Sequence, residues 1–419
     1  MPLLSQQQYC PLLPPPFFQN GGVNTNHKLL AVLLLFVLTL FPSNVSFAQS
    51  ITQDDKEEKK AALIKNFENA VQLEVATGET TEVQDPKYGT RKILINNSAK
   101  KMEALWAETA KEIAELEARS LVEREKVIKK IKEVDNSAQI TYMDKRHTPY
   151  QINKEIEIYQ ADQYFYSVDI SSEQIVEVVP VQESFTRKSG NKTKEELKRM
   201  AEEFVAKVEP NANISQLNGR VLNKGDNYFF RWEDTSQKLD SGMYPFLQVA
   251  YANNGDFLNY FNTLPFADGN PETESIAAGF NEIYANGSST YFVMEGSYST
   301  INNAGYCYIA GWCSPKNFFY TTTTTGSSTA RGYWFPNPTP LVSVYAFVPG
   351  TYATTLMACY VTTYGSNLQT DRCINQNAYI DAWVSVTYSK VSNVAYVKLT
   401  NSNDGGGGYI AWDEMWIYE

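Results

Sequence analysis

The spacing of apolar residues divides the chain into a helical part and a part rich in strands. Apolar residues recur at helical spacing in residues 52–74 and again in roughly 98–134, where lysine and glutamate fill most other positions. These runs predict a charged helical hairpin or arm over residues 49–136, with its charged faces in solvent. A coiled coil that binds a partner is the alternative for the same pattern.

From residue 140 apolar and polar positions alternate, as in KEIEIYQ and YFYSVDISSEQIVEVVPV, and this alternation predicts strands. An amphipathic helix follows at residues 192–208, and two hairpins come after it, the second turning at Asn254-Gly255. A helix followed by antiparallel strands predicts a small α+β module over residues 137–265, with the helix across one face of the sheet.

Three phrases characterise this module: TKEELKRMAEEFVAKVEP in the helix, then NYFFRWED and VAYANNGDFLNYF in the hairpins. In this order of elements, residues 154–263 resemble the PepSY family, small modules of secreted bacterial proteins and of protease propeptides. The resemblance implies a binding or inhibitory module without chemistry of its own, whose partner is a secreted protein.

The pattern changes again after a predicted linker at residues 266–290. From residue 291 charged residues are scarce, aromatic residues are dense, and short alternating runs are separated by Gly, Asn and Pro. This predicts an all-β sandwich over residues 291–419. The expected fold class is therefore multidomain, with a helical hairpin, an α+β module and a β-sandwich.

The sandwich region contains ARGYWFPNP, VSVYAFVPGTYATTLMACYVTTYG, INQNAYIDAWVSV and VAYVKLTNSNDGGGGYIAWDEMWIYE. This succession resembles the golvesin and xanthan-lyase C-terminal domain, a jelly-roll module classed as carbohydrate-binding-like. The matching residues are Trp334, Pro336, Val344, Val348, Pro349, Tyr360, Gly365, Gln376, Trp383, Val397, Leu399, Asn401 and Asp413. The resemblance implies a sandwich with Trp383 in its interior.

The chain departs from the golvesin pattern at two places. Val386-Thr387 stands where the family has Leu-Gly, and Glu414 stands where it has a small residue. The fold that the resemblance implies is little affected, but a ligand preference does not transfer.

The last strand, GYIAWDEMWIYE, carries a candidate ligand surface. Side chains alternate along a strand, so one face presents an aromatic ladder interrupted by a carboxylate: Trp412, Glu414, Trp416 and Tyr418. Flat rings beside a hydroxyl acceptor suit a sugar, so we predict a glycan-binding platform here. The alternative is that this face packs beneath another segment, because large aromatic residues are usually buried.

Two further tyrosines are candidates for ligand contact. Tyr379 ends the polar loop INQNA, and Tyr333 lies beside Gly332. Asp413 falls on the core face of the last strand, where a carboxylate must be paired, hydrogen-bonded or metal-bound. Glu295 is its candidate companion for a structural Ca²⁺; no other cofactor is expected.

Four cysteines lie in the last third of the chain. We expect the disulfides Cys307–Cys313 and Cys359–Cys373, since both close short loops, although four cysteines allow three connectivities. Metal binding is the rival, but no CxxC spacing and no nearby histidine supports it.

The N-terminus has the pattern of a secretory signal. Lys28 precedes the apolar run at residues 29–41, and Ser46 and Ala48 are the small residues of a cleavage site. We predict a signal peptide over residues 1–48, with an unusually long N-terminal extension, and a secreted or cell-envelope location. No second apolar run follows, so no membrane span is expected after cleavage.

Charge and motif content narrow the function. A net charge of −11 in 419 residues gives no electrostatic footprint for nucleic acid. His147 is the only histidine after the signal segment, and GxSxG, P-loop, GxGxxG and HExxH are absent from the sequence. Paired glycosidase carboxylates would leave no local signature.

We therefore predict no enzyme and no catalytic residue. The expected function is recognition of an extracellular or cell-envelope polysaccharide by the sandwich. One alternative is regulation or inhibition of a secreted protease by the PepSY-like module, with the sandwich as an anchor. Another is assembly through the helical arm.

Overall fold

The computed structural model describes residues 52–186, 190–239, 242–267, 281–284, 290–302, 304–306, 317–337, 339–365, 367–402 and 407–418. Residues 53–419 belong to one compact unit. The predicted signal peptide and the pair Cys307–Cys313 lie outside the described residues, as does most of the predicted linker.

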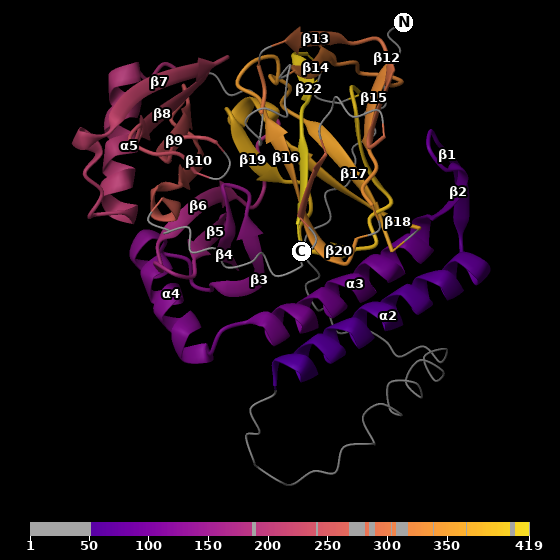
Figure 1. Cartoon of the computed structure of the whole chain (residues 1–419). Helices are drawn as coiled ribbons and strands as arrows, with labels where there is room; N and C mark the ends of the chain where they lie inside the picture. Colours follow the sequence, from indigo (N-terminus) through magenta and orange to yellow (C-terminus); the bar gives the residue numbers. More distant parts are fainter. Residues whose placement is uncertain are drawn as a thin grey trace, which may run out of the picture. The chain divides into compact units, whose positions relative to one another are not determined.

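The first elements are helices joined by a β-hairpin (Figure 1). Their bounds are α2 (Gln53–Thr77), β1 (Thr80–Asp85), β2 (Gly89–Leu94), α3 (Asn96–Glu117) and α4 (Leu121–Val134). The second predicted helix is thus two helices. Ala118 is extended, and Ser120 starts α4 with a capping box in which its side chain and that of Glu123 bond each other's backbone N–H. No helix among these described elements is long and apolar enough to cross a membrane.

The apolar stripe of α2 and α3 packs against the sandwich. Phe67 and Trp106 are buried and their rings contact each other and Tyr364, with centroid distances between 4.6 and 6.4 Å. The Trp106 indole donates to the carbonyl of Lys390 at 3.2 Å. The helices that the spacing predicts are therefore present, but their apolar stripe packs against the chain's own sandwich and not against a partner.

An eight-stranded antiparallel sheet follows, in the order β3-β4-β5-β6-β10-β9-β8-β7 (Figure 1). Its strands are β3 (Thr141–Thr148), β4 (Gln151–Gln160), β5 (Tyr164–Asp169), β6 (Ile175–Pro180), β7 (Asn218–Lys224), β8 (Asn227–Glu233), β9 (Phe246–Ala252) and β10 (Phe257–Asn262). Helix α5 (Lys194–Val208) buries its apolar stripe, including Leu197 and Val205, in the core of this sheet. The predicted α+β layer is present.

The C-terminal part is a β-sandwich, as expected. One sheet has the order β11-β23-β16-β19 and the other β12-β15-β21-β17-β18, while β13-β14-β22 forms a smaller sheet. Trp334, Trp383 and Trp416 belong to one shared core. The bounds are β11 (Asn281–Tyr284), β12 (Phe292–Gly296), β13 (Ser299–Asn302), β14 (Asn317–Thr322), β15 (Ala330–Trp334), β16 (Leu341–Val348), β17 (Ala358–Tyr364), β18 (Leu368–Ile374), β19 (Ala382–Ser385), β21 (Tyr396–Thr400), β22 (Tyr409–Trp412) and β23 (Met415–Tyr418).

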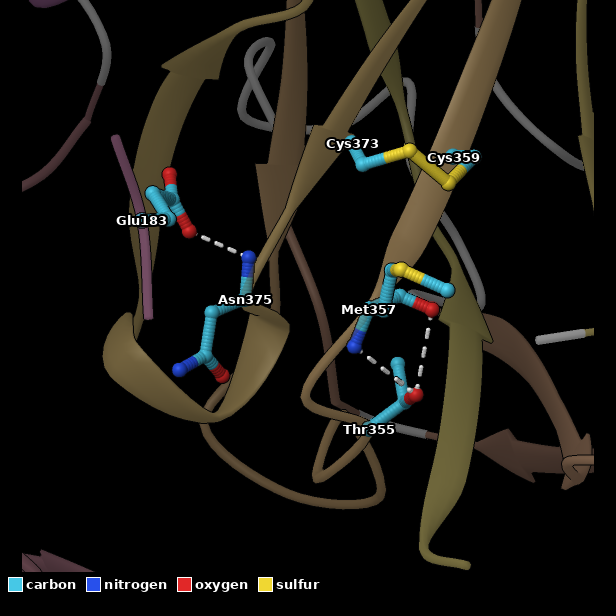
Figure 2. The surroundings of a disulfide bond; sticks show 6 residues. All are labelled: Glu183, Thr355, Met357, Cys359, Cys373 and Asn375. Atoms are coloured by element: carbon cyan, nitrogen blue, oxygen red, sulfur yellow. Dashed lines mark hydrogen bonds between the residues drawn. A yellow bond between two sulfur atoms is a disulfide. The ribbon is translucent and has the colours of Figure 1, made fainter. Parts of the chain in front are cut away.

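Strand β11 lies inside the segment predicted as a linker. It pairs with β23, with Ile283 opposite Trp416, so these four residues belong to the sandwich sheet. The predicted disulfide Cys359–Cys373 is confirmed: it joins directly opposed residues of β17 and β18 (Figure 2).

The sandwich docks on the eight-stranded sheet through the polar loop after β18, residues 376–381. Asn227 donates to the carbonyl of Asn377 at 2.8 Å, and Asn259 donates to that of Ala378 at 2.6 Å. Each side chain belongs to a strand of the sheet and is buried. The loop is therefore bound through its main chain.

Lys224 and Arg231 complete this contact. The Lys224 ammonium donates to the carbonyls of Gln376 at 3.0 Å, Tyr379 at 2.7 Å and Pro349 at 2.9 Å. The Arg231 guanidinium donates to the carbonyl of Ile380 at 2.8 Å. Three acceptors satisfy all three ammonium donors, which a buried lysine requires.

The buried Lys224 predicts a pH dependence of stability. Burial lowers its pKa to about 7, against the attraction of Asp381. Between that value and its ordinary pKa near 10.5, the unfolded chain binds more protons than the folded one, so the free energy of unfolding rises with pH. In chemical denaturation between about pH 7 and 9.5, the wild type should gain up to about 1.4 kcal/mol per pH unit relative to Lys224→Met.

The variant itself supplies the control, because it keeps every other titrating group. Lys224→Met should be less stable at every pH, since three buried carbonyls lose their donor. A difference between the two proteins that does not change with pH would contradict the lowered pKa.

Candidate functional site

The predicted platform on the last strand is not exposed. Trp412 is 0% exposed, and its indole donates to the carbonyl of Leu399 at 2.9 Å. Its ring lies so close to Gly332 that a Cβ there would meet it at 2.4 Å. The expectation that Trp412 stacks against a sugar is therefore wrong, and the packing alternative describes this ring.

A break in the strand explains the failure. Residues Asp413 and Glu414 separate β22 from β23, and these two strands belong to different sheets. The alternation of side chains does not continue across such a break. Trp412 and Trp416 therefore do not share one face.

The other members of the predicted ladder are also buried. The Trp416 ring lies 5.8 Å from that of Tyr345 and 6.4 Å from that of Trp383, and the Tyr418 ring lies 4.4 Å from that of His147. Glu414 is buried at the junction, where its carbonyl accepts the N–H of Phe347 at 2.9 Å. None of these side chains presents a sugar platform. Trp383 lies in the core, as the golvesin resemblance implied.

Tyr379 and Tyr333 are also buried among other side chains. The Tyr379 hydroxyl donates to the Glu183 carboxylate at 2.7 Å, and that carboxylate also accepts the backbone N–H of Asn375 (Figure 2). Burial raises the pKa of Glu183 and that of Tyr379. Tyr333 is buried and stacks on Phe335 with ring centroids 5.9 Å apart. Neither ring faces solvent, so the prediction of ligand contact is wrong for both.

The two predicted calcium ligands have different neighbours. The Asp413 carboxylate accepts the backbone N–H of Tyr306 at 3.2 Å and that of Glu414 at 3.0 Å, whereas Glu295 lies in β12 opposite Arg331. Burial, and then the neighbouring Glu414, raise the pKa of Asp413. In the part of the chain that the structure describes, no group of three or more acidic, histidine or cysteine side chains could hold a metal ion.

A partly exposed aromatic group lies elsewhere on the sandwich. It consists of Tyr320 in β14, Tyr352 in the loop between β16 and β17, and Tyr409 in β22, and we call it the tyrosine cluster. The ring centroids of Tyr320 and Tyr352 are 4.2 Å apart, and Tyr409 lies 5.7 and 5.5 Å from them. Tyr352 is 37% exposed and Tyr409 38%. Three segments distant in sequence thus meet here, and two of them contribute an exposed ring while Tyr320 is half-buried.

Backbone hydrogen bonds fix two of the three segments to each other. The N–H of Tyr409 donates to the Thr354 hydroxyl at 2.9 Å, and its carbonyl accepts the N–H groups of Thr354 and Thr355 at 2.8 and 2.9 Å. Gly408 has φ +93° and lies so close that a Cβ would meet the Thr354 carbonyl at 2.8 Å. The turn before β22 therefore requires glycine to approach the loop.

Tyr352 itself has a strained backbone. Its φ is +52°, in the left-handed region that a residue with a Cβ rarely adopts. Such a conformation costs on the order of 1 kcal/mol and persists only where the surroundings determine it. The loop therefore holds the Tyr352 ring at a defined position beside Tyr320.

The chain segments that carry the cluster are rich in hydroxyls. The described segments that flank the three tyrosines, residues 317–330, 349–358 and 407–412, contain no charged residue and include many threonines. Tyrosine offers a flat apolar ring with a polar tip, and threonine offers a donor and acceptor. This combination suits a ligand with apolar C–H faces and many hydroxyls.

The sequence contains only weak signals of this site. A run of five threonines follows Tyr320, and a glycine run precedes Tyr409, but both are also typical of ordinary turns and edge strands. Only the tertiary structure brings these residues to Tyr352.

An open groove with a volume of about 730 Å³ lies between α2 and α3. Its lining mixes acidic, basic and apolar side chains: Lys59, Ala62, Leu63, Asn66, Glu108, Lys111, Glu112, Glu115 and Leu116. This mixture indicates no particular ligand chemistry, and assembly through the helices stays a prediction.

No protein-family model matches this chain, and no curated protein matches it. Among solved structures, xanthan lyase from Paenibacillus is similar with a TM-score of 0.28 and 11% identity, over 67% of this chain and 35% of the lyase. An exo-β-1,3-galactanase from Phanerochaete chrysosporium has a TM-score of 0.23 and 10% identity, over 67% and 68%. Carbohydrate-binding modules of the β-sandwich superfamily have a TM-score of 0.19 and 10% identity, over 48% and 94%. At these TM-scores the likenesses establish neither fold nor function.

The burial of Trp412 gives a direct test of its role. Trp412→Ala should lower the free energy of unfolding by about 3–5 kcal/mol, because it leaves a large cavity in the sandwich core. Tyr388→Ala is the control, since Tyr388 is 58% exposed, and it should cost less than about 1 kcal/mol. Urea unfolding measures both, and equal stabilities of the two variants would contradict the core position of Trp412.

Proposed function

We propose that this protein is a secreted, non-catalytic binding protein that recognises a polysaccharide through the tyrosine cluster. The observation that carries the proposal is the meeting of Tyr320, Tyr352 and Tyr409, where Tyr352 and Tyr409 are exposed and the described segments that carry the rings contain threonines and no charged residue. An aromatic ring has a negative face, which attracts the weakly positive C–H bonds on a sugar ring, and its apolar area is removed from water on contact.

The rigidity of the cluster supports binding. The Tyr352 loop is bonded to β22 through Thr354 and Thr355, so little conformational freedom is lost when a ligand binds. Ordering mobile side chains costs about 0.5–1.5 kcal/mol each, and a surface already in place avoids that cost.

The surroundings also favour binding without catalysis. Glycoside hydrolysis needs two carboxyl groups on either side of the scissile bond. The described segments that carry the tyrosines contain no carboxyl group next to the rings. Asp413, which follows β22 and is the first acidic residue after Tyr409, is buried.

A secreted or cell-envelope location is part of the proposal. The Cys359–Cys373 disulfide supports it, because disulfides persist in oxidising compartments, and the predicted signal segment at residues 1–48 agrees. We further infer that the sandwich is a golvesin-like domain and that residues 154–263 form a PepSY-like module.

Regulation of a secreted protease receives less support. The surface of the eight-stranded sheet that carries Lys224, Asn227 and Asn259 is already occupied by the sandwich loop. A protease would need another surface or would have to displace this loop.

The proposal predicts that Tyr352→Ala/Tyr409→Ala weakens polysaccharide binding. Each stacked ring contributes roughly 1 kcal/mol beyond its buried area, so the double variant should bind about tenfold to a hundredfold more weakly in a glycan array followed by titration. Its melting temperature should stay close to that of the wild type, because both rings are partly exposed.

Tyr388→Ala is the matched control, since it removes an exposed tyrosine outside the cluster and should bind like the wild type. Undiminished binding by the double variant would move the site elsewhere.

A further inference from the structure

The three rings of the tyrosine cluster do not form a flat strip. The planes of Tyr320 and Tyr352 are inclined by 32°, so these two rings partly stack on each other. The Tyr409 plane is inclined by 69° to Tyr320 and by 79° to Tyr352. The exposed surfaces of Tyr352 and Tyr409 therefore meet as a corner.

A corner and a flat strip select different forms of polysaccharide. The sugar rings at the surface of a crystalline polysaccharide lie in one repeated plane, so they need aromatic rings that are also coplanar. A single dissolved chain turns between successive sugars, and one sugar can lie against Tyr352 while its neighbour contacts Tyr409. The observed inclination favours the single chain.

The backbone beneath the corner is held in place. The Tyr409 backbone is held by Thr354 and Thr355 at 2.8–2.9 Å, and Gly408 permits the close approach of the two segments. Tyr352 lies in a left-handed backbone conformation that fixes where its ring starts. The loop and the strand would have to give up these bonds to move apart, so within this backbone the inclination of the two rings can change only by side-chain rotation.

The charge of the protein favours a neutral ligand over an anionic one at this cluster. Glycans that carry uronate or sulfate groups are usually bound through arginine and lysine, which form strong hydrogen bonds to anions. The described segments that carry the cluster hold neither, and the chain has a net charge of −11. Within the described segments that carry the cluster, an anionic chain would therefore find no arginine or lysine to pair with, and the net charge of the chain would repel it at long range.

We propose that the tyrosine cluster binds a single, soluble chain of a neutral polysaccharide. Its inclined rings discriminate against crystalline polysaccharides, and the lack of charge in the described segments that carry the rings discriminates against anionic ones. This inference rests on the proposed glycan-binding function, and it adds the physical form and the charge of the ligand.

The test uses the full secreted chain with three classes of probe. Native affinity electrophoresis is run in gels that contain a soluble neutral polysaccharide, either galactomannan, glucomannan or a mixed-linkage glucan, or an anionic one, either alginate or heparin. Sedimentation with microcrystalline cellulose and with chitin particles tests the flat surfaces. The wild type, Tyr352→Ala/Tyr409→Ala and Tyr388→Ala are compared throughout.

We expect retardation by at least one soluble neutral polysaccharide, weakened at least tenfold in the double variant and unchanged in Tyr388→Ala. This binding should hardly change when salt is raised from about 0.05 to 0.5 M, because no ion pair is involved.

The possible outcomes distinguish a failure of this inference from a failure of the proposed glycan-binding function. Binding to crystalline particles or to the anionic polysaccharides, lost in the double variant, would overturn the inference and leave glycan binding by the cluster intact. Binding that the double variant retains would overturn both, and so would an absence of binding to every probe.

Discussion

The loop at residues 376–381 is the contact on which the rest of the structure depends. Its consecutive carbonyls accept hydrogen bonds from Lys224, Asn227 and Asn259, which hold the sandwich against the eight-stranded sheet. Buried carbonyls need such donors, because an unmet hydrogen bond costs about 1–3 kcal/mol. The polar sequence INQNAYID therefore specifies an internal contact, although polar loops more often face solvent.

The same loop also supports the tyrosine cluster. The Gln376 side chain exchanges two hydrogen bonds with the backbone of Ala411, at 3.0 and 3.1 Å, and so anchors β22 two residues from Tyr409. The Asp381 carboxylate accepts the N–H of Gly350 at 2.8 Å, two residues before Tyr352. One short segment thus connects the sheet contact with two of the three tyrosines. We infer that a change in this loop alters both the docking of the sandwich and the geometry of the cluster.

Local patterns in the sequence predicted local structure well. Helical spacing identified α2 and α5, the Asn254-Gly255 turn identified the hairpin of β9 and β10, and the short loop between the two cysteines identified the Cys359–Cys373 disulfide. The predictions failed where the outcome depends on tertiary contacts. The alternation that grouped Trp412 with Trp416 assumed one continuous strand, and the break at residues 413 and 414 sends the chain into another sheet. The tyrosine cluster combines residues 320, 352 and 409, which no local window contains.

The central claim is that a polysaccharide binds at the tyrosine cluster, and hydrogen–deuterium exchange with and without a saturating neutral oligosaccharide tests it most directly. Bound sugar should slow exchange in residues 349–357 and 407–412 and in the neighbouring strand β14, while the groove between α2 and α3 exchanges as before. Protection confined to α2 and α3, or to the eight-stranded sheet, would contradict the account.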